Sequence, residues 1–521
     1  MGPLSAYLTG RIALSNADYD LAAEALLVAL ESNPDSVDLR HQAFTATLIA
    51  GRPEAEKLAR AIPENPIAQM LLGSTDAKAG RWSQAERRFT EIPHQGPMQV
   101  IQPILVAWTK QGAGRTDDAL SMMRAVMEIQ GTRGALLPLH AALISDQADR
   151  RRDADQFYQM AAADRAGMNI RLAYLIAGWN ARTSRPENAQ RLLDQIQEAV
   201  PDAAILAPGL SGALTTRPVE SSTDGLAEVF LALGSSLRSA NTNDLALMIL
   251  GLALQLRPDF SAARLAMSDI HSSRQHNQAA LAVLMPIPAR DMLNPIVRLR
   301  QASLLERTGR TDQAVAMLRE LSRDVPRSGV PGRHLGDIYR AKSRFKDAII
   351  AYDQAIAQTP GITASDWILF YHRGIALDRD GQWDKAQADF EQALVLAPDQ
   401  PYALNYLAYS WTERGQNLTQ ARAMLEKALR ARPNDGAITD SLGWVLFRMG
   451  NLPEAVRLLE RASELEPDDP TISSHLGDVY WAVGRRIEAL YQWRRALTLN
   501  PPPEEMAQLE EKIRPEYSGP R

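Results

Sequence analysis

The sequence of 521 residues contains no cysteine. This absence excludes disulfide bonds, thiol catalysis, cysteine-based zinc sites and a lipid-modified cysteine within these residues. A chain without cysteine suits the cytosol and the periplasm equally, so the composition leaves the redox compartment open.

Long apolar runs are also missing. The longest, Leu245 to Leu254, has ten residues counting one glycine, far fewer than the ~18 to 20 that span a bilayer, and we interpret it as a buried helix. The first residues, Met1 to Ala6, lack the charged and apolar regions of a secretory signal, and Ala6 does not fit a myristoylation motif. Between a cytosolic protein and a removed leader we favour removal, because helical periodicity is already under way at Pro3.

Neither sign of charge is in large excess. The chain has 57 Lys and Arg against 62 Asp and Glu, a formal net charge of -5, which argues against binding nucleic acid or an acidic membrane along its whole length. Residues 295–350 are a local exception, with 12 basic and 6 acidic residues. Arginines there could bind carboxylates or phosphates of a partner, but we favour a solvated face because aromatic residues suited to stacking on bases are sparse.

Hydrophobic residues make up 45% of the chain, and they follow a repeat of about 34 residues. A chain this long and apolar exceeds one compact domain, so several domains or a repeat array are expected. The pattern is Ala, a large apolar residue four positions on, Ala three further and Pro five further, with a small residue 12 or 13 positions before the first Ala. Successive prolines lie 38, 35, 34 and 34 residues apart, at Pro360, Pro398, Pro433, Pro467 and Pro501.

Each part of this pattern has a structural reason. The small residues sit where two helices approach closely, for example Gly374 and Ala386, and the large residue fills the remaining gap. Proline ends the second helix. Gly381, Gly415, Gly450 and Gly484 supply the turn between the two helices.

With these residues the sequence resembles the tetratricopeptide repeat superfamily, whose units are two antiparallel helices stacked into a right-handed superhelix. Weaker copies begin near Gly10, Gly73, Gly234 and Ala302. The resemblance implies an all-α fold, a right-handed α-solenoid of about 13 to 14 helical hairpins. We expect residues 504 to 513 to form a capping helix on the last repeat.

We expect four segments in this array. An N-terminal lobe of degenerate repeats occupies residues 1–200, a connector rich in Pro, Gly, Ser and Thr occupies 201–226, and a C-terminal lobe occupies 227–503. The capping helix and tail follow at 504–521. The connector is either a hinge or a passive joint between the lobes.

Residues 401–497 carry a narrower resemblance. The strings NYLAYSW, DSLGW, HLGDVYW and QWRRAL are similar to those of long alphaproteobacterial tetratricopeptide proteins that are made with a signal peptide and placed in the periplasm. The chain also resembles, more loosely, outer-membrane lipoprotein adaptors that deliver substrates to a periplasmic carboxyl-terminal processing protease. The resemblance implies a periplasmic or outer-membrane location, with any membrane contact through a leader or lipid anchor that is absent here; a cytoplasmic protein is the alternative.

Signatures of catalysis and cofactor binding are missing from the sequence. It has no Walker loop, dinucleotide fingerprint, His-Glu-x-x-His or Gly-x-Ser-x-Gly. His271 and His276 are five residues apart, a spacing that does not align two metal ligands on one helical face. We therefore expect no cofactor, no metal and no enzymatic activity.

Partner-binding residues follow from the repeat register that the resemblance implies, in which first helices line a concave wall. Tyr and Trp offer large rigid area with one hydrogen-bonding group, which suits a peptide or helix. The positions that resemble groove-facing ones are Arg333, Asp337, Arg340, Tyr371, Tyr402, Asn405, Tyr409, Asp440, Trp444 and Trp481. Some of them, notably Trp481, could instead pack between neighbouring first helices.

The sequence departs from the two-carboxylate clamp with which some tetratricopeptide co-chaperones hold chaperone tails, because it supplies only Asn405 and no accompanying Lys. We expect a noncatalytic adaptor for protein or peptide partners in the bacterial envelope, among which a processing protease or its substrates would fit. The alternatives are, in order, a cytosolic assembly factor or co-chaperone, a repeat-bearing enzyme such as a glycosyltransferase, and a reader of single-stranded RNA. Nucleic acid is not an expected partner.

Overall fold

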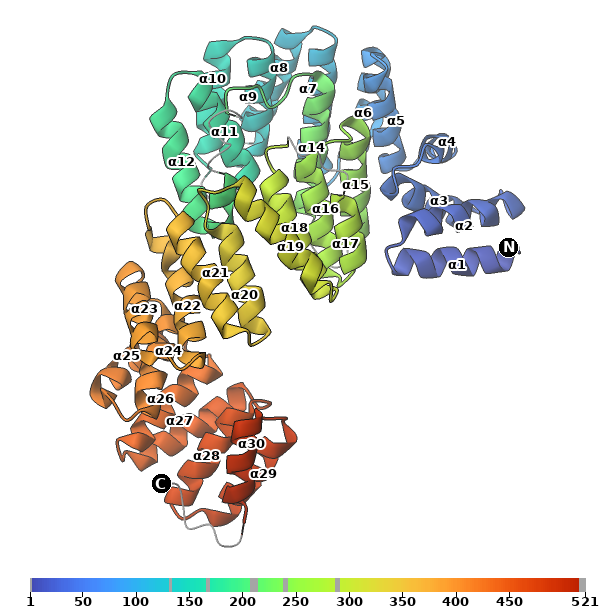
Figure 1. The fold of residues 1–521 in the computed structure, drawn as a ribbon. Helices are drawn as coiled ribbons and strands as arrows, with labels where there is room; N and C mark the ends of the chain where they lie inside the picture. Colours follow the sequence, from blue (N-terminus) through green and yellow to red (C-terminus); the bar gives the residue numbers. More distant parts are fainter. Residues whose placement is uncertain are drawn as a thin grey trace. The chain divides into compact units, whose positions relative to one another are not determined.

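The computed structural model describes residues 2–130, 134–164, 169–206, 214–237, 242–285 and 291–514. In these residues 29 α-helices and no strand occur, which confirms the all-α fold (Figure 1). Two compact units divide the chain, an N-terminal unit, Met1–His334, and a C-terminal unit, Leu335–Arg521.

The N-terminal unit begins with six hairpins, continues through a short 3-10 helix, η1, and ends with three further hairpins and the start of a fourth. Its helices are α1 (Pro3–Ser15), α2 (Tyr19–Ser32), α3 (Val37–Ile49), α4 (Glu54–Arg60), α5 (Pro66–Lys78), α6 (Trp82–Glu91), α7 (Met98–Gly112), α8 (Thr116–Gln130), α9 (Leu136–Gln147), α10 (Arg151–Ala162), α11 (Ile170–Arg182), α12 (Pro186–Ala199), η1 (Pro201–Leu206), α14 (Ser222–Ser236), α15 (Asn243–Leu256), α16 (Ser261–Ser273), α17 (Asn277–Leu284), α18 (Asn294–Arg307) and α19 (Thr311–Asp324).

The C-terminal unit takes up most of α20 and continues as hairpins to a single terminal helix. Its helices are α20 (Val330–Ala341), α21 (Phe345–Gln358), the 3-10 helix η2 (Ala364–Asp366), α22 (Trp367–Arg379), α23 (Trp383–Leu396), α24 (Pro401–Glu413), α25 (Leu418–Ala431), α26 (Gly436–Arg448), α27 (Leu452–Leu465), α28 (Pro470–Ala482), α29 (Arg486–Thr498) and α30 (Pro503–Lys512). The described helices of the chain thus form 14 hairpins followed by α30, in agreement with the predicted number of repeats and the predicted cap.

In seven hairpins a glycine of the first helix lies close to a large side chain of the second. A Cβ added to Gly374 of α22 would lie 2.7 Å from Phe390 of α23, sixteen residues later. Gly477 meets Trp493 in the same way. The other pairs at this spacing are Gly10 and Leu26, Gly73 and Phe89, Gly234 and Leu250, Gly336 and Tyr352, and Gly443 and Leu459. The predicted roles of the small and large repeat residues are therefore confirmed.

The turns between helices also follow the sequence pattern. Gly381 and Gly450 have φ of 79° and 82°, in the left-handed region that glycine adopts without steric cost. Gly415 and Gly484 also have positive φ.

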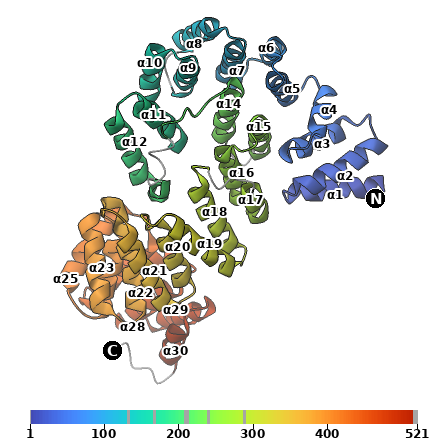
Figure 2. The same ribbon diagram turned by 45° about the horizontal axis from the view of Figure 1, so that its top comes forward.

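The inner face of the N-terminal unit is filled by its own seventh hairpin. Helices α14 and α15 pack against the first helices α3, α5, α7 and α9, and Figure 2 shows them inside the arc that those hairpins trace. A Cβ on Gly225 of α14 would lie 2.3 Å from the Trp108 ring of α7. Lys78 Nζ donates to the Gln255 carbonyl at 3.0 Å. One continuous core therefore joins residues from α1 to α16.

A buried histidine, His140, forms a hydrogen bond with the Trp108 ring that contacts Gly225. Trp108 Nε1 donates to His140 Nδ1 at 3.0 Å, and both side chains are fully buried. Because the indole N–H can only donate, His140 is held neutral with its proton on Nε2. Burial lowers the pKa of His140 to about 3.

The expected connector at 201–226 does not separate the two compact units. Its first part is η1, whose Asp202 accepts hydrogen bonds from Arg333 and lies 3.1 Å from His334 Nε2. Its last part, from Ser222, is the start of α14. The boundary lies after His334 instead, because the apolar helices α14 and α15 are buried in the core of the first unit. Residues 207–213 lie outside the described residues.

Replacing Gly225 by Ala should destabilise the N-terminal unit by about 1 to 3 kcal/mol, because the added methyl group overlaps the Trp108 ring. Gly178→Ala is the matched control, since its Cβ would lie 3.8 Å from the nearest atoms and alanine favours the helix by up to about 1 kcal/mol. Urea unfolding, monitored by the hydrogen exchange of the α14 amides, measures the change in the free energy of unfolding for both variants. Equal stability of the two variants would contradict the packing of α14 against α7.

Acid should destabilise the N-terminal unit through His140. Its folded pKa lies below the unfolded value, so its contribution is complete above pH ~6.5 and is lost as pH falls toward about 3, a change on the order of 4 kcal/mol. His140→Gln should flatten this part of the pH profile, because glutamine can accept from Trp108 and does not titrate. An unaltered acid profile for His140→Gln would refute the assignment.

Candidate functional site

The first helices of the C-terminal unit form its inner face. Helix α24 contacts α26, and α26 contacts α28, in addition to the contacts within and between consecutive hairpins. Contacts between successive first helices bring that side of the stack closer together than the side of the second helices. The predicted groove residues from Asp337 onward lie on these helices, so we call this side the inner face of the C-terminal unit.

An aromatic cluster lies at the start of this face. The ring of Tyr371 meets the ring of Tyr406 edge-on at 6.2 Å, and Tyr406 lies 4.9 Å from Phe390. Tyr406 donates to Asp378 at 3.2 Å, and burial followed by that carboxylate raises its pKa. Tyr406 was not among the predicted site residues. The signal that could have found it is the string NYLAYSW, which places three aromatic residues within one helix.

Further along the face, Asp440, Trp444 and His475 form a buried network. His475 Nδ1 lies 2.9 Å from the Asp440 carboxylate, and its ring stacks on Trp444 at 4.0 Å. Trp444 Nε1 donates to Glu413 at 2.6 Å. Asp440 is 4% exposed and Trp444 8%, so these two predicted site residues bind α24, α26 and α28 together.

Tyr402, Asn405 and Tyr409 lie between these two clusters on α24. Tyr402 is 39% exposed, with the Arg432 guanidinium 5.5 Å from its ring. Asn405 Oδ1 is buried and has no hydrogen-bond partner among the residues that the structure describes. Burial raises the pKa of half-buried Tyr409, and the charges of Glu413, Asp440 and Glu505 raise it further. This stretch combines two phenols, one unpaired acceptor and nearby carboxylates.

The remaining predicted residues contact other parts of the chain. Arg333 belongs to the N-terminal unit and pairs with Asp202. Asp337 accepts from Tyr352 at 2.7 Å and lies 2.6 Å from His372 Nδ1.

At the two ends of the inner face, Arg340 donates to Tyr352 at 3.4 Å. The Arg486 guanidinium lies 3.8 Å above the Trp481 ring. The structure thus brings Tyr371, Tyr402, Asn405, Tyr409, Asp440 and Trp444 to one face, with Asp337, Arg340 and Trp481 towards its ends.

The basic stretch at 295–350 is partly neutralised. Arg298 pairs with Asp324 and Glu320, and Arg300 pairs with Asp269 at 2.9 Å. Such pairs agree with the favoured solvated face, because arginines already held by carboxylates are less available to a partner.

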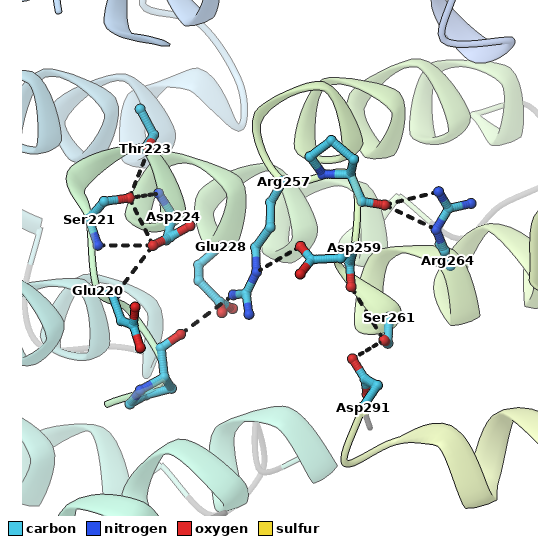
Figure 3. Close-up of polar contacts among 12 residues, drawn as sticks. Glu220, Ser221, Thr223, Asp224, Glu228, Arg257, Asp259, Ser261, Arg264 and Asp291 are labelled. Atoms are coloured by element: carbon cyan, nitrogen blue, oxygen red, sulfur yellow. Dashed lines mark hydrogen bonds and ion pairs between the residues drawn. The ribbon is translucent and has the colours of Figure 1, made fainter. Parts of the chain in front are cut away.

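Two polar clusters in the N-terminal unit serve the fold. In the first, Ser221 caps α14 by accepting from the Asp224 amide, while the Asp224 carboxylate accepts from the Ser221 amide (Figure 3). Nearby, Arg257 lies over the Phe260 ring at 4.8 Å and reaches the Pro218 carbonyl. These contacts fix the loops at both ends of the hairpin formed by α14 and α15.

The second is a polar cleft of about 460 Å³ between the ends of α9 and α11. Arg182 donates to Asp146 at 2.6 Å, and Arg217 pairs with Asp149. The charges that line the cleft are therefore largely satisfied by one another.

No group of three or more His, Asp and Glu side chains in the described part of the chain could hold a metal ion. None of the helices described is both long and apolar enough to cross a membrane.

Part of the chain matches a known family of helical repeats. Family profiles described as tetratricopeptide repeat match residues 299–361, 371–436 and 415–476. These segments carry tetratricopeptide repeats. Four other hairpins, α1–α2, α5–α6, α14–α15 and α28–α29, have the same contact between a glycine and a large side chain sixteen residues later.

Relatives of the chain bear repeats of the same kind. A curated TPR repeat-containing protein of Pseudomonas aeruginosa is 27% identical over 164 residues, which cover 31% of this chain. The match spans only 27% of that relative's length.

Solved tetratricopeptide structures align with TM-scores below 0.5. A repeat protein from Parabacteroides merdae is 16% identical, covers 47% of this chain and 95% of its own, and has a TM-score of 0.39. The APC/C hetero-tetramer of Cut9 and Hcn1 is 14% identical, covers 98% and 96%, and has a TM-score of 0.42. Overlaps of this quality carry no functional argument.

Alkaline pH should loosen the contact between α26 and α28. Burial alone would lower the pKa of His475, but the charge and hydrogen bond of Asp440, with further acidic neighbours, raise it overall. The stability that this ion pair adds is therefore complete below pH ~6.5 and is lost as pH rises through the folded pKa. Hydrogen exchange of α28 should accelerate with pH more in the wild type than in His475→Gln, after correction for intrinsic rates. Identical pH dependence in the two proteins would contradict the charged state of His475.

Proposed function

We propose that this protein is a noncatalytic adaptor that docks an extended segment of a partner protein on the inner face of its C-terminal unit. Tetratricopeptide repeats generally mediate protein–protein interactions. One observation carries the choice of face: the inner face of the N-terminal unit is filled by α14 and α15, whereas that of the C-terminal unit keeps Tyr402 exposed and leaves Asn405 Oδ1 without a partner in the described part of the chain.

The chemistry of α24 supports an extended peptide as the bound segment. A buried acceptor without a donor is unfavourable, and a main-chain N–H of a partner would satisfy Asn405. The rings of Tyr402 and Tyr409 flank Asn405 at three and four residues along the same helix, and Tyr371 lies on the preceding first helix. Rigid aromatic side chains of this kind give contact area at low entropic cost.

We propose that the adaptor works in the periplasm or at the outer membrane, with a processing protease or its substrates as partners. The narrower resemblance of residues 401–497 supports this location. A cytosolic assembly factor of the same architecture is the second candidate. Fractionation of the native host separates the two, since an envelope protein would be found with periplasmic or outer-membrane markers.

Site-specific photocrosslinking tests the docking face. A benzoylphenylalanine at Tyr402 should capture a discrete partner in the native host, because this side chain lies on the inner face. The same probe at Ala423, an exposed residue on α25, should capture none, and Asn405→Leu should reduce the Tyr402 adduct. Equal adducts at both positions, or none at Tyr402, would refute docking on this face.

A further inference from the structure

The second helix of the last hairpin, α29, presents an apolar stripe to solvent. Ile487 is 82% exposed and Tyr491 64%, and Val483, just before the helix, is 37% exposed. Ile487 and Tyr491 are four residues apart on α29, so they lie on one ridge about 6 Å apart along the helix axis, and Val483 lies in the turn that precedes the helix. We call this ridge, with Arg494 at its end, the α29 stripe.

Packing of the repeats does not require large apolar residues here. Counted from the first alanine of the repeat, Ile487 and Tyr491 lie two residues before and two after Ala489. In the four preceding hairpins both positions are exposed as well. The residues there are Lys346, Asp384, Thr419 and Pro453 before the alanine, and Ile350, Ala388, Ala423 and Arg457 after it. Among these five hairpins, only the one formed by α28 and α29 has large apolar side chains at both positions.

The charge at the end of the stripe is also reversed. Arg494 lies five residues after Ala489, where the four preceding hairpins have Asp353, Glu391, Glu426 and Glu460. Arg494 is exposed and has no ion-pair partner among the described residues. The acidic Glu488 beside Ile487 is already held by Arg485 at 3.0 Å.

A second basic residue stands at the start of α29. Arg486 takes a position that is apolar in the preceding hairpins, at Phe345, Trp383, Leu418 and Leu452. Its guanidinium lies over Trp481, at the end of the inner face, so Arg486 is not part of the stripe and Arg494 is the basic residue beside it.

We propose that the α29 stripe docks an amphipathic helix of a partner protein, one that carries apolar side chains on one ridge and carboxylates beside it. The apolar ridge fits between the ridges of a facing helix, and a carboxylate would pair with Arg494 in fork geometry. This surface lies on a second helix, away from the inner face, so it does not depend on the proposed function. The adaptor would then hold two partners at once.

Selection from a display library of 20-residue helices, randomised on one face and panned against the intact chain, tests this surface. Enriched helices should carry apolar residues four apart and an excess of Asp and Glu. Binding should fall at least about tenfold for the double variant Ile487→Gln, Tyr491→Gln, and by a smaller factor for Arg494→Glu, which restores the acidic residue of the other hairpins.

Ile350→Gln is the matched control, because Ile350 has the register of Tyr491 on α21 and is 57% exposed. It should bind the selected helices as the wild type does. The proposal is overturned if no helix is enriched, if enriched helices show no acidic excess, or if they bind the double variant unchanged. Binding of phosphatidylglycerol vesicles that needs Ile487 and Tyr491, in the absence of any enriched helix, would assign the stripe to a membrane surface instead.

Discussion

The close approach of two helices within a hairpin, where in seven hairpins a glycine faces a large side chain sixteen residues later, is the contact on which the rest of this structure depends. A Cβ at Gly336 or Gly477 would lie 2.4 Å from the ring it faces, so these positions fix how the helices meet. Once this contact is set, every other position in the repeat has a defined direction, inward, outward or between hairpins. Packing of the helices does not determine the side chains at the inward and outward positions. An unusual side chain at such a position therefore indicates a role in binding.

The same kind of contact is used a second time, between hairpins far apart in the chain. Gly225 meets Trp108, and Gly251 lies 3.1 Å, measured from its Cβ position, from the Leu48 carbonyl. These contacts place α14 and α15 on the inner face of the preceding hairpins and join them in one core. The same repeat therefore serves two purposes. The first unit buries its inner face against its own helices, and the second leaves part of its inner face, around Tyr402 and Asn405, to solvent or to a partner.

Much of the fold could be predicted from the sequence, because the glycines, prolines and alanines recur at a fixed spacing and each has a local structural reason. The return of α14 and α15 could not be, since Gly225 and Trp108 are 117 residues apart and their contact has no period. The candidate site stays a prediction. The register assigns the predicted residues to the first helices, but whether a residue there is free depends on the neighbouring hairpin: His475 covers Asp440 and Trp444, and Asp202 holds Arg333. Such pairs are set by side chains one hairpin or more away, which spacing within a single repeat does not reveal.

Hydrogen exchange of the α14 and α15 amides in the intact chain tests the central claim most directly, namely that the first unit fills its own inner face. If these helices are part of one core with α3, α5, α7 and α9, their slowest amides should exchange as slowly as those of α7, through unfolding of the whole unit. Exchange of α14 and α15 that is orders of magnitude faster than that of α7 would show a separately opening hairpin. The inner face of the first unit would then be available to partners, and the contrast between the two units would be lost.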